Sequence, residues 1–121
     1  MSRFARADRR LSLIQADTFR VVLVTAGSLR EAQGLARIVL KERLAACVNL
    51  IPNIQSWYWW KGRVASGKEV LLLIKTTRAS LNVLCQVLKS HHSYEIPEFI
   101  ALPITHGNLA YLRWLKENIA L

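Results

Sequence analysis

The chain has 121 residues, a length that fits one domain and excludes a multidomain enzyme. Hydrophobic residues make up 52% and charged residues 21%, so the composition indicates a packed core rather than a disordered chain. No uninterrupted apolar run exceeds five residues, whereas a transmembrane helix needs roughly 20, so we expect no membrane partner.

Seventeen Lys and Arg residues against eight Asp and Glu residues give a net charge of +9. Such a charge suits nucleic acid, anionic lipid or acidic small molecules, but it also serves as a solubility device, which is the simpler explanation. Residues 1–18 are polar and mixed, with several arginines and no apolar periodicity. We expect them to form a flexible basic arm ahead of a single domain at residues 19–121.

The two cysteines, Cys47 and Cys85, lie singly within apolar stretches. This arrangement argues against a secreted disulfide scaffold and for a reducing compartment, so we expect a cytoplasmic protein. A buried thiol behaves mainly as a small hydrophobic group, and core packing is the expected role of each cysteine.

The first half of the domain begins with a strand and a helix. Residues 19–25 are apolar at both odd and even positions, which predicts a central strand covered on two faces. Ser28 and Glu31 have the spacing of a capping box and precede an amphipathic stripe, so a helix follows. Residues 45–51 predict a second strand, which the Pro-Asn pair at 52–53 is expected to end.

A hairpin and a long strand are expected next. Residues 54–60 and 63–64 predict the two arms of a hairpin around the Lys-Gly turn at 61–62. A Ser-Gly turn is expected at 66–67, and residues 68–77 then predict a long strand.

The second half repeats the pattern and adds a helix. Residues 78–92 predict an amphipathic helix, and residues 99–104 predict a strand after Pro97. Asn108 is expected to cap a third helix with an apolar face over residues 109–119. The order β-α-β-β-α-β with an extra C-terminal helix predicts an α+β fold of the ferredoxin-like type.

Two helices cover only one face of such a sheet, yet residues 70–74 direct apolar groups to both faces. Trp57, Tyr58, Trp59 and Trp60 repeat the pattern, because alternate residues of a strand point to opposite sides. Solvent exposure of two of these rings would create a patch of the size that usually marks an interface. We therefore expect a homo-oligomer whose interface includes Trp57, Trp59 and Trp60.

Five ordered segments together resemble one family. They are LKERLAACVNLIP (residues 40–52), WYWWKG (57–62), KEVLLLIKTT (68–77), LKSHHSYEIPE (88–98) and YLRWL (111–115). These segments resemble the CutA family, the divalent-cation tolerance proteins, over about residues 20–119. The resemblance implies a ferredoxin-like subunit in a tight homotrimer, similar in assembly to the PII signalling proteins. It also implies a non-catalytic role in tolerance of copper or other divalent cations.

His91 and His92 are candidate metal ligands. The alternative is that they only end the predicted helix at 78–92, where their partial positive charge interacts favourably with the helix dipole. The resemblance implies that His91 and Glu69 bind copper. Two ligands are too few for a tight site, so we expect His92, a neighbouring subunit or water to complete the coordination. The family's proposed copper site also uses a cysteine where this chain has Val24, so a soft thiolate is missing. One imidazole and one carboxylate favour Cu(II) or Zn(II), bound weakly and not as an obligatory cofactor.

The resemblance also picks out a recurrent polar set: Lys75, Tyr94, Glu95 and Glu98. These residues are expected to line a cleft between subunits, where they bind a small molecule or form an interfacial network of hydrogen bonds and ion pairs. The small-molecule alternative corresponds to a PII-like signalling protein.

Two other ferredoxin-like classes are less favoured. Gly62-Arg63-Val64 resembles the phosphate loop of acylphosphatases, but a hairpin turn explains the glycine. RNA-recognition domains carry stacking aromatics on central strands, whereas the central strand here is VLLLI, so we expect no specific nucleic-acid partner. No Ser-His-Asp, Cys-His or paired-carboxylate pattern demands catalysis, and we expect the protein not to be an enzyme.

Overall fold

The structure is a computed structural model that describes residues 13–121. None of the helices in this part of the chain is long and apolar enough to cross a membrane. The elements are, in order, β1 (Leu13–Gln15), β2 (Phe19–Ala26), α1 (Leu29–Lys41), β3 (Cys47–Trp60), β4 (Arg63–Thr77), the 3₁₀ turn η1 (Arg78–Ser80), α2 (Leu81–His91), β5 (Ile100–Pro103), β6 (His106–Asn108) and α3 (Leu109–Glu117).

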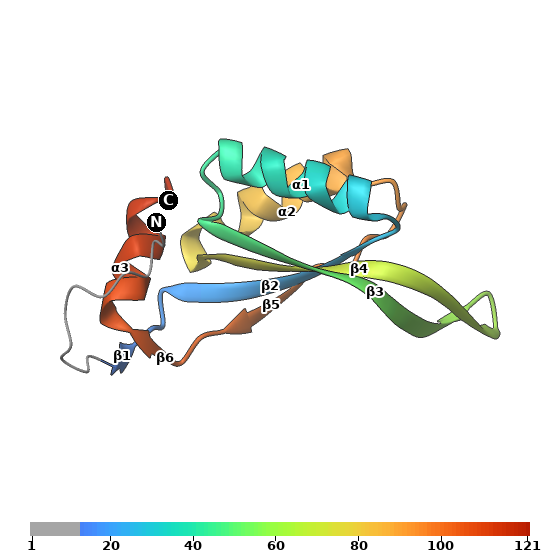
Figure 1. Ribbon diagram of the computed structural model, residues 1–121, viewed down its shortest axis with the longest axis horizontal. Helices are drawn as coiled ribbons and strands as arrows, with labels where there is room; N and C mark the ends of the chain where they lie inside the picture. Colours follow the sequence, from blue (N-terminus) through green and yellow to red (C-terminus); the bar gives the residue numbers. More distant parts are fainter. Residues whose placement is uncertain (1–12) are drawn as a thin grey trace.

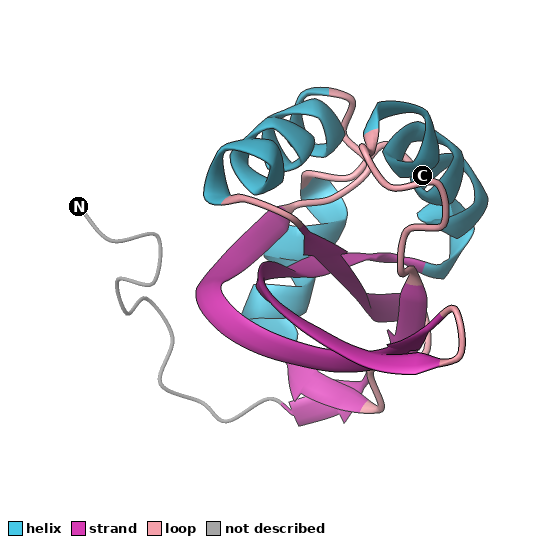
Figure 2. Cartoon of the chain, turned by 90° about the vertical axis from the view of Figure 1, so that its right-hand side faces the viewer, coloured by secondary structure: helices cyan, strands magenta, loops and turns pink. Residues whose placement is uncertain are grey.

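The main sheet has four antiparallel strands in the order β3-β4-β2-β5. Helices α1 and α2 lie side by side on one face of this sheet (Figures 1 and 2). This strand order, with one helix after β2 and one after β4, confirms the predicted ferredoxin-like fold.

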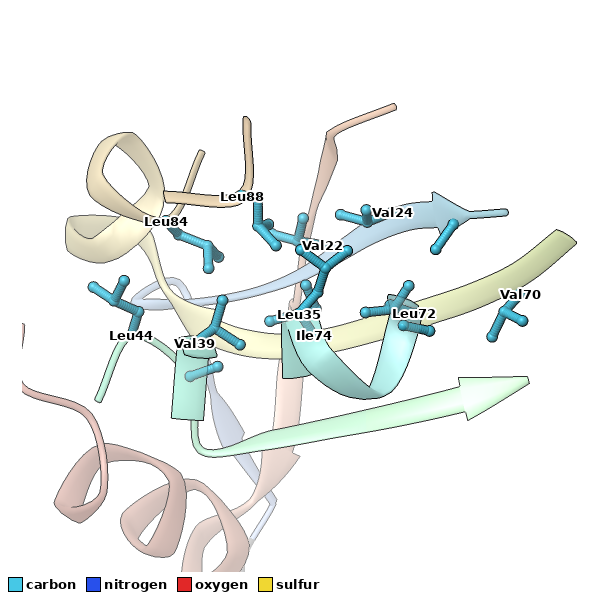
Figure 3. Packing of buried hydrophobic residues seen from close by; sticks show 13 residues of the cluster. Val22, Val24, Leu35, Val39, Leu44, Val70, Leu72, Ile74, Leu84 and Leu88 are labelled. Atoms are coloured by element: carbon cyan, nitrogen blue, oxygen red, sulfur yellow. The ribbon is translucent and has the colours of Figure 1, made fainter. Parts of the chain in front are cut away.

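The main core lies between α1, α2 and one face of the sheet (Figure 3). Along β2 and β4, buried residues alternate with half-buried ones, because successive side chains of a strand point to opposite faces. The buried set on these two strands comprises Val22, Val24, Ala26, Val70, Leu72 and Ile74. The other face carries apolar residues as well, and no helix of residues 13–121 covers most of it.

Helix α1 begins and ends with recognisable caps. The Oγ atom of Ser28 accepts a hydrogen bond from the backbone N–H of Glu31 at 3.1 Å, which confirms the predicted N-cap. At the other end Arg43 has a positive φ of 58°, and the N–H of Leu44 donates to the carbonyl of Val39 at 3.0 Å. This is a Schellman-type termination, and it directs the chain from α1 into β3.

Strand β3 is longer than predicted because the Pro-Asn pair does not end it. The register of β3 against β4 shifts between Ile51 and Ile54, so Pro52 and Asn53 lie in a bulge. Asn53 has a φ of 59°, a conformation that asparagine adopts more readily than most residues. β3 is the outer strand of the sheet, where a proline is tolerated because its missing N–H can face away from the ladder.

Strand β4 is likewise continuous, and the predicted turn at 66–67 is wrong. Ser66 pairs with Trp57 and Gly67 pairs with Ser56 inside the β3–β4 ladder. The real turn is at 61–62, as predicted, and both of its residues have positive φ, 50° and 76°. Such values belong to a type I′ turn, whose second position strongly favours glycine. The result is a hairpin that extends well beyond the helices (Figure 1).

The N-terminal boundary of the domain differs from the expected one. Strand β1 pairs antiparallel with β6, and Ala16 is buried and bonded from its N–H to the carbonyl of Thr105 at 2.9 Å. Residues 13–18 therefore belong to the folded domain rather than to a flexible arm. Edge pairing with a strand more than 90 residues away has no local sequence signal, which explains the error. The rest of the expected arm, residues 1–12, lies outside the described residues.

Helix α3 covers one end of the face opposite α1 and α2. Asn108 caps it as predicted, since its Oδ1 accepts from the N–H of Ala110 at 3.0 Å. Leu112 and Leu115 pack there in a second cluster of buried residues that also includes Phe19, Cys47 and Ala16.

A substitution in this second cluster tests the revised boundary. Ala16→Asp should lower the free energy of unfolding by about 2 kcal/mol or more, because it places an uncompensated charge among buried apolar side chains. The neighbouring Gln15→Asp is the control, since Gln15 is exposed and its replacement should change stability by less than about 0.5 kcal/mol. Urea unfolding measures the free energy of unfolding of both variants. Equal effects would contradict the revised boundary and would support the original expectation that residues 13–18 belong to a flexible arm.

Candidate functional site

A cavity of about 680 Å³ lies where the β3–β4 hairpin meets the segment that follows α2. Residues from β2, β3, β4 and the 94–98 segment line it: Thr25, Ser56, Trp57, Tyr58, Trp60, Glu69, Tyr94, Glu95, Ile96 and Glu98. It thus includes three of the four residues predicted for a polar cleft, Tyr94, Glu95 and Glu98, together with the predicted metal ligand Glu69.

Strand register explains which hairpin residues reach the cavity. Ile54 pairs with Glu69, so the alternate residues Ser56, Tyr58 and Trp60 share the face of Glu69. By the same alternation Trp57 and Trp59 lie on the other side of the strand. Trp57 nevertheless lines the cavity, whereas Trp59, which is 75% exposed, does not. The sequence pattern predicted the tryptophans as interface residues but gave no signal for Tyr58 as a site residue, because the bulge at 52–53 sets which hairpin residues share the face of Glu69.

The cavity is acidic although the chain is strongly basic. Three of its lining residues are glutamates, and none of the lining residues is Lys, Arg or His. Burial raises the pKa of Glu98 above its ordinary value, and the negative charge of Glu69 raises it further. A cation in the cavity would relieve this repulsion between carboxylates.

Tyr94 is held against the sheet by a hydrogen bond. Its Oη donates to Oε2 of Glu69 at 2.7 Å. Burial, followed by this carboxylate acceptor, raises the pKa of Tyr94 well above the ordinary phenol value, so the ring stays a neutral donor. Gly27 permits the close approach, because a Cβ at that position would lie 3.3 Å from the tyrosine oxygen.

His92 is a buried structural residue. Its side chain is 0% exposed, its Nε2 lies 2.7 Å from the carbonyl of Thr25, and its Nδ1 accepts the N–H of Tyr94 at 3.0 Å. These partners require the neutral tautomer with the proton on Nε2, and they occupy both ring nitrogens. The prediction of His92 as a metal donor is therefore corrected: in this structure the ring has no nitrogen left for an ion.

Glu31 completes the anchor of the 92–95 segment. Its carboxylate accepts hydrogen bonds from the N–H of Ser93 at 2.8 Å, from the Ser93 hydroxyl at 3.0 Å and from the N–H of Gly27 at 3.3 Å. Burial alone would raise the pKa of Glu31, but the hydrogen bonds from Ser93 and Gly27 outweigh it and lower the pKa. The sequence identified Glu31 only as part of a helix cap, since nothing local links it to a residue 62 positions away.

His91, the other predicted metal ligand, lies outside the cavity lining. It ends α2 as an exposed residue, and its Nδ1 lies 2.9 Å from the carbonyl of Val87 and 3.1 Å from Oγ of Ser90. Across residues 13–121 the structure contains no group of three or more His, Cys, Asp or Glu side chains placed to hold a metal ion. One subunit thus supplies no complete metal site in this part of the chain.

Lys75 is also separate from the cavity. It shares a face of β4 with Glu69 but is six residues further along, a distance of about 20 Å on an extended strand. Its Nζ donates to Oδ1 of Asn49 and lies 4.0 Å from Sγ of Cys47. The predicted polar set is therefore split between two places on the same sheet face.

The molecule is a ferredoxin-like α+β protein with an extended hairpin and an acidic, aromatic cavity at its base. A family model described as CutA1 divalent ion tolerance protein matches residues 20–118. The chain belongs to the CutA1 family, as the sequence resemblance predicted. Strand β1 precedes the matched region.

Named relatives agree with this assignment. The divalent-cation tolerance protein CutA of Thermus thermophilus is 47% identical over 81% of this chain and 95% of its own length. The chloroplastic protein CutA 1 of rice is 48% identical over 81% of this chain, which spans 55% of the rice protein's length. The structure of CutA from Synechococcus elongatus superposes with a TM-score of 0.86 at 38% identity, covering 90% of this chain and 96% of that one.

The anchor of the cavity segment can be tested through Glu31. Glu31→Gln should lower the free energy of unfolding by about 1 to 2 kcal/mol at pH 7, because a charged acceptor of several hydrogen bonds becomes neutral. Because the folded-state pKa of Glu31 is lowered, its stabilisation is present above the ordinary value of 4.5 and is lost as the pH falls through the lowered value. Stability curves of wild type and variant should therefore converge in acid.

The control for this test is Glu42→Gln, at the exposed C-cap of the same helix. It should leave stability nearly unchanged at pH 7. A difference between wild type and Glu31→Gln that stays constant down to strongly acidic pH would show that the carboxylate charge is not what anchors the segment.

Proposed function

We propose that this CutA1-family protein acts as a homotrimer that binds divalent transition-metal ions weakly, without catalysing a reaction. The observation that carries the proposal is a cavity lined by Glu69, Glu95 and Glu98 on a chain of net charge +9. The negative charge of Glu69 contributes to the raised pKa of Glu98, and a cation bound between them would offset this repulsion. The relatives are named divalent-cation tolerance proteins, and a divalent cation is the class of ligand proposed here.

Trimer formation is supported by the face of the sheet that α1 and α2 leave open. Half-buried Val21, Leu23, Leu71 and Leu73 lie on it, and Ile100 and Leu102 add apolar surface that is 47% and 44% exposed. On the hairpin, Trp57, Trp59 and Trp60 are 67%, 75% and 54% exposed. Exposed apolar surface of this kind is characteristic of protein interfaces, and packing of three subunits against one another would remove it from water.

Metal coordination is proposed at Glu69, with His91 as the imidazole donor. A carboxylate oxygen and an imidazole nitrogen suit Cu(II) or Zn(II) better than Mg(II) or Cu(I). Two ligands are too few for a tight site, so a neighbouring subunit or water must complete the coordination. The ion is thus an exchangeable ligand rather than an obligatory cofactor.

We also propose a reducing compartment, with the cytoplasm as the first choice. Cys47 and Cys85 are both thiols, and Cys47 is buried beside Lys75 on the open sheet face. Two cysteines that lie singly in apolar stretches of the sequence argue against a secreted disulfide scaffold and for a reducing compartment. β4 carries no aromatic residue and the one aromatic of β2, Phe19, is buried in the second cluster, which supports the view that nucleic acid is not a specific partner.

The trimer proposal is tested with two arginine substitutions at sites of similar exposure. Leu102→Arg, on the open sheet face, should shift the protein from trimer to monomer, because it places an unpaired charge in an apolar interface. Val83→Arg, on the outer side of α2 and 41% exposed, should leave a trimer. Sedimentation at micromolar concentration measures both. A wild-type monomer, or a trimer that survives Leu102→Arg, would contradict the proposed interface.

The metal proposal is tested by calorimetric titration of Cu(II) and Zn(II) into the metal-free trimer. His91→Ala and Glu69→Gln should each weaken binding at least several-fold, whereas His106→Ala, at an exposed position on β6, should not. Affinity should be lower in acid than at neutral pH, because protons compete with the metal for the imidazole and carboxylate donors. Equal affinity of wild type and His91→Ala would remove that residue from the site.

A further inference from the structure

We propose that the same cavity binds a small organic cation, an alkylammonium with one or more protonated nitrogens. This inference goes beyond metal binding and rests on a different feature, the aromatic wall. Trp57, Tyr58, Trp60 and Tyr94 all line the cavity. A hydrated metal ion makes no use of such a wall, so these rings indicate a ligand that has apolar surface as well as charge.

The charge of the ligand follows from the polar lining. Glu69, Glu95 and Glu98 are acceptors, and no basic side chain is among the lining residues. An anionic or neutral ligand would leave these carboxylates unpaired in a partly desolvated space, which is costly. A protonated amine donates hydrogen bonds to them and relieves the repulsion between Glu69 and Glu98.

The aromatic rings favour an organic over an inorganic cation. Ammonium groups are attracted to the faces of tryptophan and tyrosine rings, and the attraction strengthens as water is excluded. The alkyl part of the ligand would also pack against Trp57 and Trp60, which line the cavity. The volume of about 680 Å³ is within the range of small-molecule sites.

The cavity is organised in advance for such a ligand. The hydroxyl of Tyr94 binds Oε2 of Glu69, which leaves Oε1 of that carboxylate to accept from an amine. The segment that carries Tyr94 is itself fixed by the buried His92 and by Glu31. Little conformational entropy would therefore be lost at these positions on binding, which increases affinity.

The test uses the full-length trimer in metal-free buffer containing a chelator. The probe is 1,8-diaminooctane, and the matched neutral compound is 1,8-octanediol, which has the same chain without the charges. Calorimetry should detect binding of the diamine and at least tenfold weaker binding of the diol. Equal binding of the two would show an unselective apolar pocket, and no binding of the diamine at millimolar concentration would overturn the proposal.

Adjacent tryptophans provide the matched variants. Trp60→Leu should weaken diamine binding roughly 3- to 30-fold, the range expected for loss of one cation–π contact. Trp59→Leu, compared as assembled trimer isolated by size exclusion, should leave diamine affinity unchanged, because Trp59 belongs to the same hairpin but does not line the cavity. If Trp60→Leu does not fold into the trimer, Tyr58→Leu on the same face serves the same purpose. Equal effects of the Trp59 and Trp60 variants would contradict the assigned site.

The outcome is separable from that of the metal proposal. His91→Ala should abolish most metal binding but leave diamine binding intact, because His91 is not a lining residue. Trp60→Leu should do the reverse. Competition by Mg²⁺ at a concentration equal to the diamine would show that charge alone attracts the ligand, which would overturn the inference without affecting the metal proposal.

Discussion

The central strands β2 and β4 are apolar on both faces, while α1 and α2 cover only one. Most other features of the molecule depend on this imbalance. On the covered face, Leu72 and Ile74 lie fully buried under the helices. On the open face, α3 protects only the end near Phe19 and Cys47. The remaining apolar surface supports the proposed trimer, since a sheet of this kind is stable in water only when another layer removes its second face from solvent.

The cavity is located where this open face continues into the hairpin. A bulge at 52–53 sets the alternation of β3, and the alternation directs Tyr58 and Trp60 to the side of Glu69. The 94–98 segment closes the other side because His92 and Glu31 fix its start to β2 and α1. Fold stability and site geometry are therefore coupled through the few polar contacts of His92 and Glu31, and loss of either side chain would affect both.

Local patterns predicted the helices and their caps well, because capping and amphipathic spacing act over three or four residues. They were less successful along the hairpin. Pro52-Asn53 and Ser66-Gly67 have the composition of turns, yet both lie within strands. Ladder hydrogen bonds and the edge position of β3 outweighed the local preference. Pairing of β1 with β6 was missed for a related reason, since it joins segments distant in the chain.

For the candidate site too, some features follow from the sequence and others only from the tertiary structure. The sequence by itself determined the family, the order of elements and the identities of Glu69, Tyr94, Glu95 and Glu98, because these depend on residue type and spacing along the chain. Only the tertiary structure decided that those four residues share a cavity, that Lys75 lies elsewhere, and that the ring of His92 is already fully hydrogen-bonded. The physical reason is that such relations are set by strand register and long-range hydrogen bonds, which join residues that no local pattern connects.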